Sequence, residues 1–101
     1  MIKAVCMFRL KDGIDEKDFE IYFKKHVNDA KKLKNLKKYT IAKSIKEEGK
    51  KNFYRINELY FNSVKDLEDS FSSKLGEDAS EDLLKWVSDF KCIVVEEEKV
   101  L

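Results

Sequence analysis

The chain has 101 residues, a length that suits one domain with a single hydrophobic core. Charged side chains make up 41% of it, but 21 Lys and Arg residues nearly balance 20 Asp and Glu residues, and the formal net charge is +1. This balance is typical of an ion-paired surface and disfavours a polyanion-binding protein. The first ten residues lack the pattern of a signal peptide, and no stretch has the roughly 20 apolar residues of a membrane span. We therefore expect a cytoplasmic protein without a membrane partner.

The first half of the chain predicts a strand, a helix and a second strand. Ile2–Leu10 alternates in the manner of a β-strand until the sequence Lys-Asp-Gly ends it. Asp15 is a suitable N-cap for a helix whose apolar spacing continues to about Leu33. Leu36–Ile45 alternates again, and it is the second predicted strand.

Two further strands are predicted downstream. The polar run Lys46–Asn52 contains a glycine and predicts a hairpin connection. It leads into Phe53–Phe61, which carries large apolar residues on both faces and predicts the third strand. Phe90–Val95 is the fourth.

The segment between the third and fourth strands predicts a broken helical region. Ser63, followed three residues later by Asp66, resembles a capping box and begins the first part. Gly76 is expected to end or interrupt this helix, and Ser80 to restart the helical pattern. The connection is therefore either one helix containing a loop or two short helices.

The order of these elements predicts an α+β, ferredoxin-like βαββαβ fold. In such a fold a four-stranded antiparallel sheet carries its helices on one face, and the other face should be polar. Here the strands carry apolar residues in both registers, as where Val5 and Met7 alternate with Cys6 and Phe8. Because an exposed apolar face is an aggregation hazard, we expect a second copy of the sheet to cover it in a homodimer.

The two cysteines, Cys6 and Cys92, both lie within apolar strand patterns. Free cysteine is one of the most often buried residue types. We interpret both as small buried hydrophobic residues, in preference to a disulfide framework or a metal site.

The segment from Phe19 to Tyr39 resembles the first-helix signature of the EthD-like family. That signature has a Phe, an aromatic pair and a His, followed by leucines and by a Tyr that enters the second strand. The segment from Ile56 to Ser63 is similar to the third strand of the family, where an acidic residue precedes an aromatic or apolar pair and a helix start. The matching residues of the first segment are Phe19, Tyr22, Phe23, His26, Leu33, Leu36 and Tyr39.

The resemblance implies a dimeric α+β barrel that takes in the whole chain, residues 1–101, as one domain. Proteins of this superfamily are mostly cofactor-free and have a pocket between helices and sheet in each subunit. We accordingly expect a homodimer with no cofactor and with a site for a small hydrophobic ligand.

His26 is the one side chain whose ordinary pKa suits acid–base chemistry near neutral pH. Its spacing from Phe23 and Ala30 places it beside the apolar stripe of its helix, where the ring can reach the pocket. Like His26, Tyr39 matches the family motif, and the two form the expected catalytic pair. His26 would move a proton on a small carbonyl or lactone substrate, and Tyr39 would donate to the developing oxyanion. In the alternative interpretation His26 bonds a nearby carbonyl or carboxylate and Tyr39 fills the core.

Phe23, Asn57 and Trp86 are the expected ligand contacts. Asn57 is a polar residue within an apolar strand, so it must find a partner, face the pocket or lie in the dimer interface. Arg55 and Glu58 are also polar residues within this apolar strand, and each needs a partner or a cavity. We interpret Glu58 as structural. Trp86 has the alternative of an ordinary core position in the second helical region.

The sequence favours an EthD-like protein that acts as a cofactor-free isomerase, dehydratase or monooxygenase-like enzyme on a small hydrophobic carbonyl compound. A non-catalytic ligand-binding or structural homodimer is the alternative. An RNA-recognition module has the same element order, but Phe53–Phe61 lacks the glycines of its third strand, and we expect no nucleic-acid partner. The sequence has no metal-ligand cluster, nucleophile–base pair or Gly-rich phosphate loop.

Overall fold

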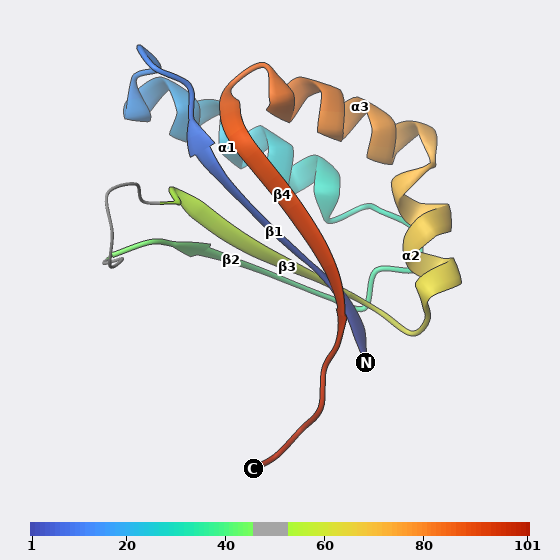
Figure 1. Cartoon of the computed structure of the whole chain (residues 1–101). Helices are drawn as coiled ribbons and strands as arrows, with labels where there is room; N and C mark the ends of the chain where they lie inside the picture. Colours follow the sequence, from blue (N-terminus) through green and yellow to red (C-terminus); the bar gives the residue numbers. More distant parts are fainter. Residues whose placement is uncertain (46–52) are drawn as a thin grey trace.

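The four strands of the sheet lie in the order β2 (Lys38–Lys43), β3 (Arg55–Phe61), β1 (Ile2–Leu10) and β4 (Val87–Glu96), and every neighbouring pair is antiparallel. The computed structural model describes residues 1–45 and 53–101, so the hairpin predicted for Lys46–Asn52 lies outside the described residues. The three helices of the described residues all lie on one face of the sheet (Figure 1). The predicted α+β, ferredoxin-like fold is therefore confirmed. Along the chain, α1 (Glu16–Ala30) lies between β1 and β2, and α2 (Val64–Phe71) and α3 (Lys74–Leu84) lie between β3 and β4.

The face of the sheet that carries the helices, here called the inner face, holds the core. Successive side chains of a strand point to opposite faces, and on β1 the inner residues Ala4, Cys6 and Phe8 are all buried. Two apolar clusters pack over them, one containing Phe61 and the other containing Phe19. The candidate site described below lies in this layer.

The opposite face of the sheet, here called the outer face, carries no helix of the described residues (Figure 1). On this face Val5 of β1 pairs with Ile93 of β4, and Met7 of β1 pairs with Ile56 of β3. Ile93 is 51% exposed and Ile56 is 36% exposed. The outer face thus carries the apolar residues that the sequence predicts, next to the charged Glu58, which pairs with Val5.

Two of the predicted helix starts, at Asp15 and Ser63, are confirmed. Asp15 Oδ1 accepts hydrogen bonds from the backbone N–H groups of Lys17 at 2.7 Å and Asp18 at 3.3 Å. Ser63 Oγ accepts one from the N–H of Asp66 at 3.1 Å. These caps satisfy N–H groups for which a helix has no internal acceptor, so each fixes where its helix begins.

The second helical region breaks at Ser73, and not at Gly76 or Ser80 as predicted. α2 ends at Phe71, and Ser73 Oγ accepts from the N–H of Gly76 at 3.2 Å to begin α3. A Cβ on Gly76 would lie 2.5 Å from the carbonyl oxygen of Ser70 and 2.6 Å from that of Phe71. A glycine is therefore required at position 76, because α3 begins directly against the end of α2. Gly76 lies within α3 and does not end a helix.

The fourth strand begins at Val87, three residues before the predicted start at Phe90. A β-bulge lies near the start of β4. Arg9 of β1 pairs with Ser88, but Met7 pairs with Lys91, so the register of the two strands shifts by one residue between these pairs. Asp89, within the bulge, has a φ of 51°, in the left-handed region that Asp enters more readily than most residues.

Other boundaries are shorter than predicted. β2 lacks two residues at each end of the predicted Leu36–Ile45, and β3 begins at Arg55 and not at Phe53. α1 ends at Ala30, three residues before the predicted helix end at Leu33. Leu33 lies in the turn that follows, where its N–H donates to the Ala30 carbonyl at 3.1 Å. Leu33 is nevertheless buried, because the turn carries it back onto the core.

Candidate active site

A cavity of about 140 Å³ lies between the inner face of the sheet and the helices. All four strands contribute to its floor, and all three helices, with the turn after α1, contribute to its roof. His26, Tyr39 and Asn57 line it together with apolar side chains such as Leu59 and Leu83. Three of the five site residues predicted from the sequence therefore meet in one place.

Small residues leave the space for this cavity. Cys6 lies on the floor, and Ala30 and Ala79 face it from α1 and α3. Gly76 also lines it, and the end of α2 leaves no room for a larger residue there. Since protein interiors are normally close-packed, small residues on both sides of one gap create a defined void.

Asn57 is the most buried polar side chain of the cavity wall, with 4% of its surface exposed. It lies on the inner face of β3, between Ile41 of β2 and Cys6 of β1 in one row across the sheet. Within the described residues its Oδ1 accepts no hydrogen bond. Leaving such an oxygen unpaired costs about 1–3 kcal/mol. A hydrogen-bond donor bound in the cavity would remove this cost.

His26 reaches the cavity from α1. Its Nδ1 lies 3.4 Å from the hydroxyl oxygen of Tyr22, and its ring stacks on that of Phe23. Burial lowers the pKa of His26 below its ordinary value of 6.5, and the carboxylates of Asp29 and Asp82 oppose this shift only in part. The imidazole is therefore neutral near pH 7, the state in which it accepts a proton.

Tyr39 reaches the cavity from β2, where it lies opposite Leu59 of β3. Burial raises the pKa of Tyr39 to about 12. Its hydroxyl thus keeps its hydrogen at neutral pH and can donate a hydrogen bond to a ligand oxygen. Together, His26 and Tyr39 provide a proton acceptor and a hydrogen-bond donor in one cavity.

Phe23 and Trp86, the other predicted ligand contacts, do not line this cavity. Both lie in the neighbouring core cluster with Phe19, and Trp86 stacks on Tyr22 with ring centroids 5.0 Å apart. Phe23 therefore supports the ring of His26, and Trp86 supports the tyrosine that contacts His26. For Trp86 the structure agrees with the alternative interpretation, a core position.

The structure adds Cys6 and Cys92 to the cavity wall. Cys6 is buried as predicted, but Cys92 is exposed, so the prediction for Cys92 is wrong. Both thiols are free, and their Sγ atoms lie 2.8 Å apart. Strand alternation alone places both cysteines on the inner face, but their pairing depends on the bulge in β4, which the sequence did not reveal.

The remaining polar residues of β3 lie outside the cavity lining. Arg55 forms an ion pair with Glu20 of α1 on the inner side. Glu58 lies on the outer face, 3.0 Å from Lys3 Nζ of β1, which also lies 2.9 Å from Glu97. Glu58 thus links two neighbouring strands, which agrees with its structural interpretation.

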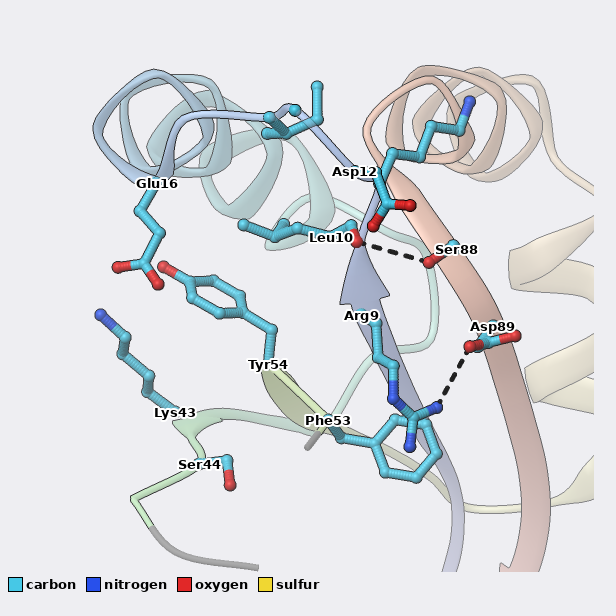
Figure 2. Close-up of a pocket in the computed structure, with 13 residues that line it drawn as sticks. Arg9, Leu10, Asp12, Glu16, Lys43, Ser44, Phe53, Tyr54, Ser88 and Asp89 are labelled. Atoms are coloured by element: carbon cyan, nitrogen blue, oxygen red, sulfur yellow. Dashed lines mark hydrogen bonds and ion pairs between the residues drawn. The ribbon is translucent and has the colours of Figure 1, made fainter. Parts of the chain in front are cut away.

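A larger hollow of about 800 Å³ lies where β1 ends (Figure 2). Arg9 crosses it between the ring of Phe53, whose centroid lies 4.1 Å from the guanidinium carbon, and the carboxylate of Asp89, which lies 3.3 Å from Nη1. None of the predicted site residues lines this hollow. The smaller cavity is therefore the candidate site.

Two further features bear on the kinds of site that the chain can hold. Across residues 1–45 and 53–101, no three His, Cys, Asp or Glu side chains are grouped so that they could bind a metal ion. No helix in the same two ranges is long and apolar enough to cross a membrane.

Solved structures with the same fold match nearly the whole chain. An EthD (ethyl tert-butyl ether D) family protein from Bacillus halodurans has a TM-score of 0.83 and 21% identity, covering 97% of this chain and 99% of its own. The hydroxynitrile lyase of Passiflora edulis has a TM-score of 0.84 and 14% identity, with coverages of 99% and 95%. A dimeric protein of ferredoxin-like fold from Bacteroides fragilis has a TM-score of 0.76 and 12% identity, with both coverages 95%.

No family model matches the sequence, and no curated protein matches it. At the identities above, the structural likeness shows the fold and not the activity. That fold is the one implied by the resemblance of residues 19–39 to the EthD-like family, and an EthD family protein is among the structures that share it.

Proposed function

We propose that this chain is an EthD-like enzyme that performs cofactor-free acid–base chemistry on a small hydrophobic carbonyl compound. The observation that carries the proposal is the convergence of His26, Tyr39 and Asn57, from three different elements, on one largely apolar cavity. A few polar groups in an apolar pocket are the usual form of a small-molecule site. The hydroxynitrile lyase of similar structure is an enzyme of this fold, which supports an enzymatic use of it here.

The cavity limits the size and polarity of the substrate. Its volume of about 140 Å³ is close to that of an engineered cavity of about 150 Å³ that holds benzene. The reacting part of the substrate is therefore about as large as one small ring. Leu59 and Leu83 favour a hydrophobic body, and the unpaired oxygen of Asn57 favours a hydroxyl group on it.

His26 is the base. When its Nδ1 carries the hydrogen, Nδ1 donates to the hydroxyl oxygen of Tyr22, and the lone pair of Nε2 is left for the substrate. Nε2 then takes a proton from the carbon next to the substrate carbonyl, and the electrons of the broken C–H bond form an enolate. Tyr22 is a positioning residue, because its hydroxyl contacts Nδ1 of His26 and its side chain does not line the cavity.

Tyr39 stabilises the charge that this step creates. Its hydroxyl is protonated at neutral pH, since its pKa is about 12, and it donates a hydrogen bond to the enolate oxygen. Return of the proton from His26 to another carbon isomerises the substrate, and loss of a hydroxyl group as water dehydrates it. Reaction of the enolate with O₂ would give the oxygenase outcome. The base and the donor perform the first step without a further group.

We also propose that the chain forms a homodimer through the outer face of the sheet. Val5, Met7, Ile56 and Ile93 give this face an apolar middle that no helix of the described residues covers. The Bacteroides fragilis protein with a ferredoxin-like fold is dimeric, which supports the proposal. The cavity lies on the inner face, so the dimer would leave it accessible.

An NMR screen tests the proposed function. The ¹⁵N-labelled chain is titrated with cyclopentanone, 2-hydroxycyclopentanone and a small lactone, and each ligand is followed over time. We expect chemical-shift changes at His26, Tyr39 and Asn57, stronger binding of the hydroxyketone than of the plain ketone, and conversion of at least one compound. Binding without conversion would contradict the enzyme and support the non-catalytic alternative. Shift changes confined to other residues would contradict the site.

A further inference from the structure

The two cysteines of the chain face each other across neighbouring strands. Cys6 of β1 and Cys92 of β4 are directly paired in the register of the sheet, and both line the cavity. Their Sγ atoms lie 2.8 Å apart, about 0.8 Å farther than the roughly 2.0 Å of a covalent S–S bond. The mechanism proposed above uses neither thiol.

The positions of the two residues suit a covalent bond between them. Opposed residues of an antiparallel pair have Cβ atoms about 4.5–5.5 Å apart, and disulfides need about 3.5–4.5 Å. The remaining closure is small, and the side chains already point toward each other, since the sulfur atoms are in contact. The edge position of β4 in the sheet also lets this strand shift toward β1 without disturbing a strand on its other side.

We propose that Cys6 and Cys92 form a peroxide-reactive dithiol site that closes to a reversible disulfide in the wall of the cavity. Cys92 is exposed and is the thiol that meets the oxidant, and Cys6 is buried behind it. This site is separate from the acid–base function, because its reaction needs neither a ligand in the cavity nor His26.

The environments of the two thiols agree with these unequal roles. The hydrogen bond between them lowers the pKa of Cys92, and the same bond together with burial raises the pKa of Cys6. The thiolate is the reactive form of cysteine, so Cys92 supplies the nucleophile and Cys6 stays a thiol until Cys92 has reacted.

The reaction has two steps and consumes one molecule of hydrogen peroxide. The Cys92 thiolate attacks one peroxide oxygen, the O–O bond breaks, and the products are Cys92 sulfenic acid and hydroxide, which takes up a proton to become water. The sulfur of Cys6 then attacks that of Cys92. The S–S bond forms as the S–O bond breaks, and the hydroxyl group leaves with the Cys6 proton as a second water. The two thiols are thus oxidised together and the peroxide is reduced.

Intact mass spectrometry of the full chain tests the proposal. The reduced, folded protein is treated with equimolar hydrogen peroxide, then alkylated and weighed. We expect the wild-type chain to lose two hydrogen atoms, to resist alkylation at both cysteines, and to give a peptide that links residues 6 and 92. Dithiothreitol should restore the original mass and both thiols. Retention of two alkylatable thiols, or disulfides only between chains, would overturn the proposal.

Two matched single variants test the order of the steps. In Cys6→Ser the sulfenic acid on Cys92 has no resolving thiol, so dimedone should trap it, whereas in Cys92→Ser the buried Cys6 should react at least tenfold more slowly. Serine is close to cysteine in size, and circular dichroism checks that both variants fold. Faster oxidation of Cys6 than of Cys92 would overturn the assigned roles. The readouts involve no substrate, so their failure is distinguishable from a failure of the proposed enzyme.

Discussion

The ring of His26 lies over that of Phe23, one turn earlier on α1, with centroids 5.6 Å apart and 13° between the ring planes. This packing keeps the imidazole out of water, and burial lowers its pKa below 6.5. We therefore expect an NMR titration of the ring C–H signals of His26 to give a pKa below 6.5 in the folded chain. A value at or above 6.5 would contradict the assignment of His26 as a base that is neutral at pH 7.

The lowered pKa of His26 also predicts how stability depends on pH. Below pH 6.5 the unfolded chain binds the His26 proton more readily than the folded chain does. The free energy of unfolding should consequently fall as the pH drops from 6.5 to the folded-state pKa of His26, and His26→Gln should lose this part of the fall. Urea unfolding at about pH 7.5 and about pH 5.5 measures the difference. Equal losses in the wild type and the variant would show that folding does not perturb His26.

Replacing Tyr39 by Phe should slow the chemistry without unfolding the protein. The hydroxyl of Tyr39 is protonated at neutral pH, and loss of one oxyanion donor typically lowers a rate by about 10²–10³-fold. The measurement is deuterium exchange next to the carbonyl of cyclopentanone in D₂O, followed by NMR. Tyr54→Phe is the matched control, because burial also raises the pKa of Tyr54 to about 12 but Tyr54 does not line the cavity. Equal effects of the two substitutions would remove Tyr39 from the mechanism.

Replacing Asn57 by Leu should stabilise the chain and weaken ligand binding. The two side chains have similar shapes, and the substitution removes a buried oxygen that accepts no hydrogen bond within the described residues. We expect a gain of about 1 kcal/mol in the free energy of unfolding by urea titration. The exposed Asn62→Leu is the control, with an expected change within about 0.5 kcal/mol. A loss of stability in Asn57→Leu would instead assign the amide a structural role.

A charge on the outer face should separate the proposed dimer. Ile93 and Val94 are neighbours in β4 with similar exposure, 51% and 48%, but they point to opposite faces of the sheet. Ile93→Lys should lower the mass measured by light scattering after size exclusion to that of one chain, and Val94→Lys should leave it at two chains. A wild-type protein that elutes as a single chain would contradict the dimer.

The features that the sequence predicted correctly depend on local patterns. The caps at Asp15 and Ser63 need only neighbouring backbone groups, and the alternation of β1 shows which of its side chains face the helices. The helical spacing that placed His26 beside the apolar stripe of α1 is equally local, and the ring does line the cavity.

The features that the sequence missed depend on contacts between distant segments. The role of Gly76 follows from its approach to the carbonyl groups at the end of α2, and the early start of β4 at Val87 follows from a bulge opposite β1. The pairing of Cys6 with Cys92 depends on that same bulge. Trp86 had two interpretations, a ligand contact and a core position, because spacing within a predicted helical region does not show which neighbour a side chain meets; in the structure it packs on the core.

Deuterium exchange with His26 present or absent tests the central claim most directly. The wild-type chain and His26→Gln are each incubated with cyclopentanone in D₂O, and loss of the hydrogens next to the carbonyl is followed by NMR. Proton removal by His26, with charge stabilisation by Tyr39 in the same cavity, predicts exchange that is about 10²-fold or more faster with the wild-type chain than with the variant. Equal exchange rates with the two proteins, both folded, would contradict an acid–base site in this cavity.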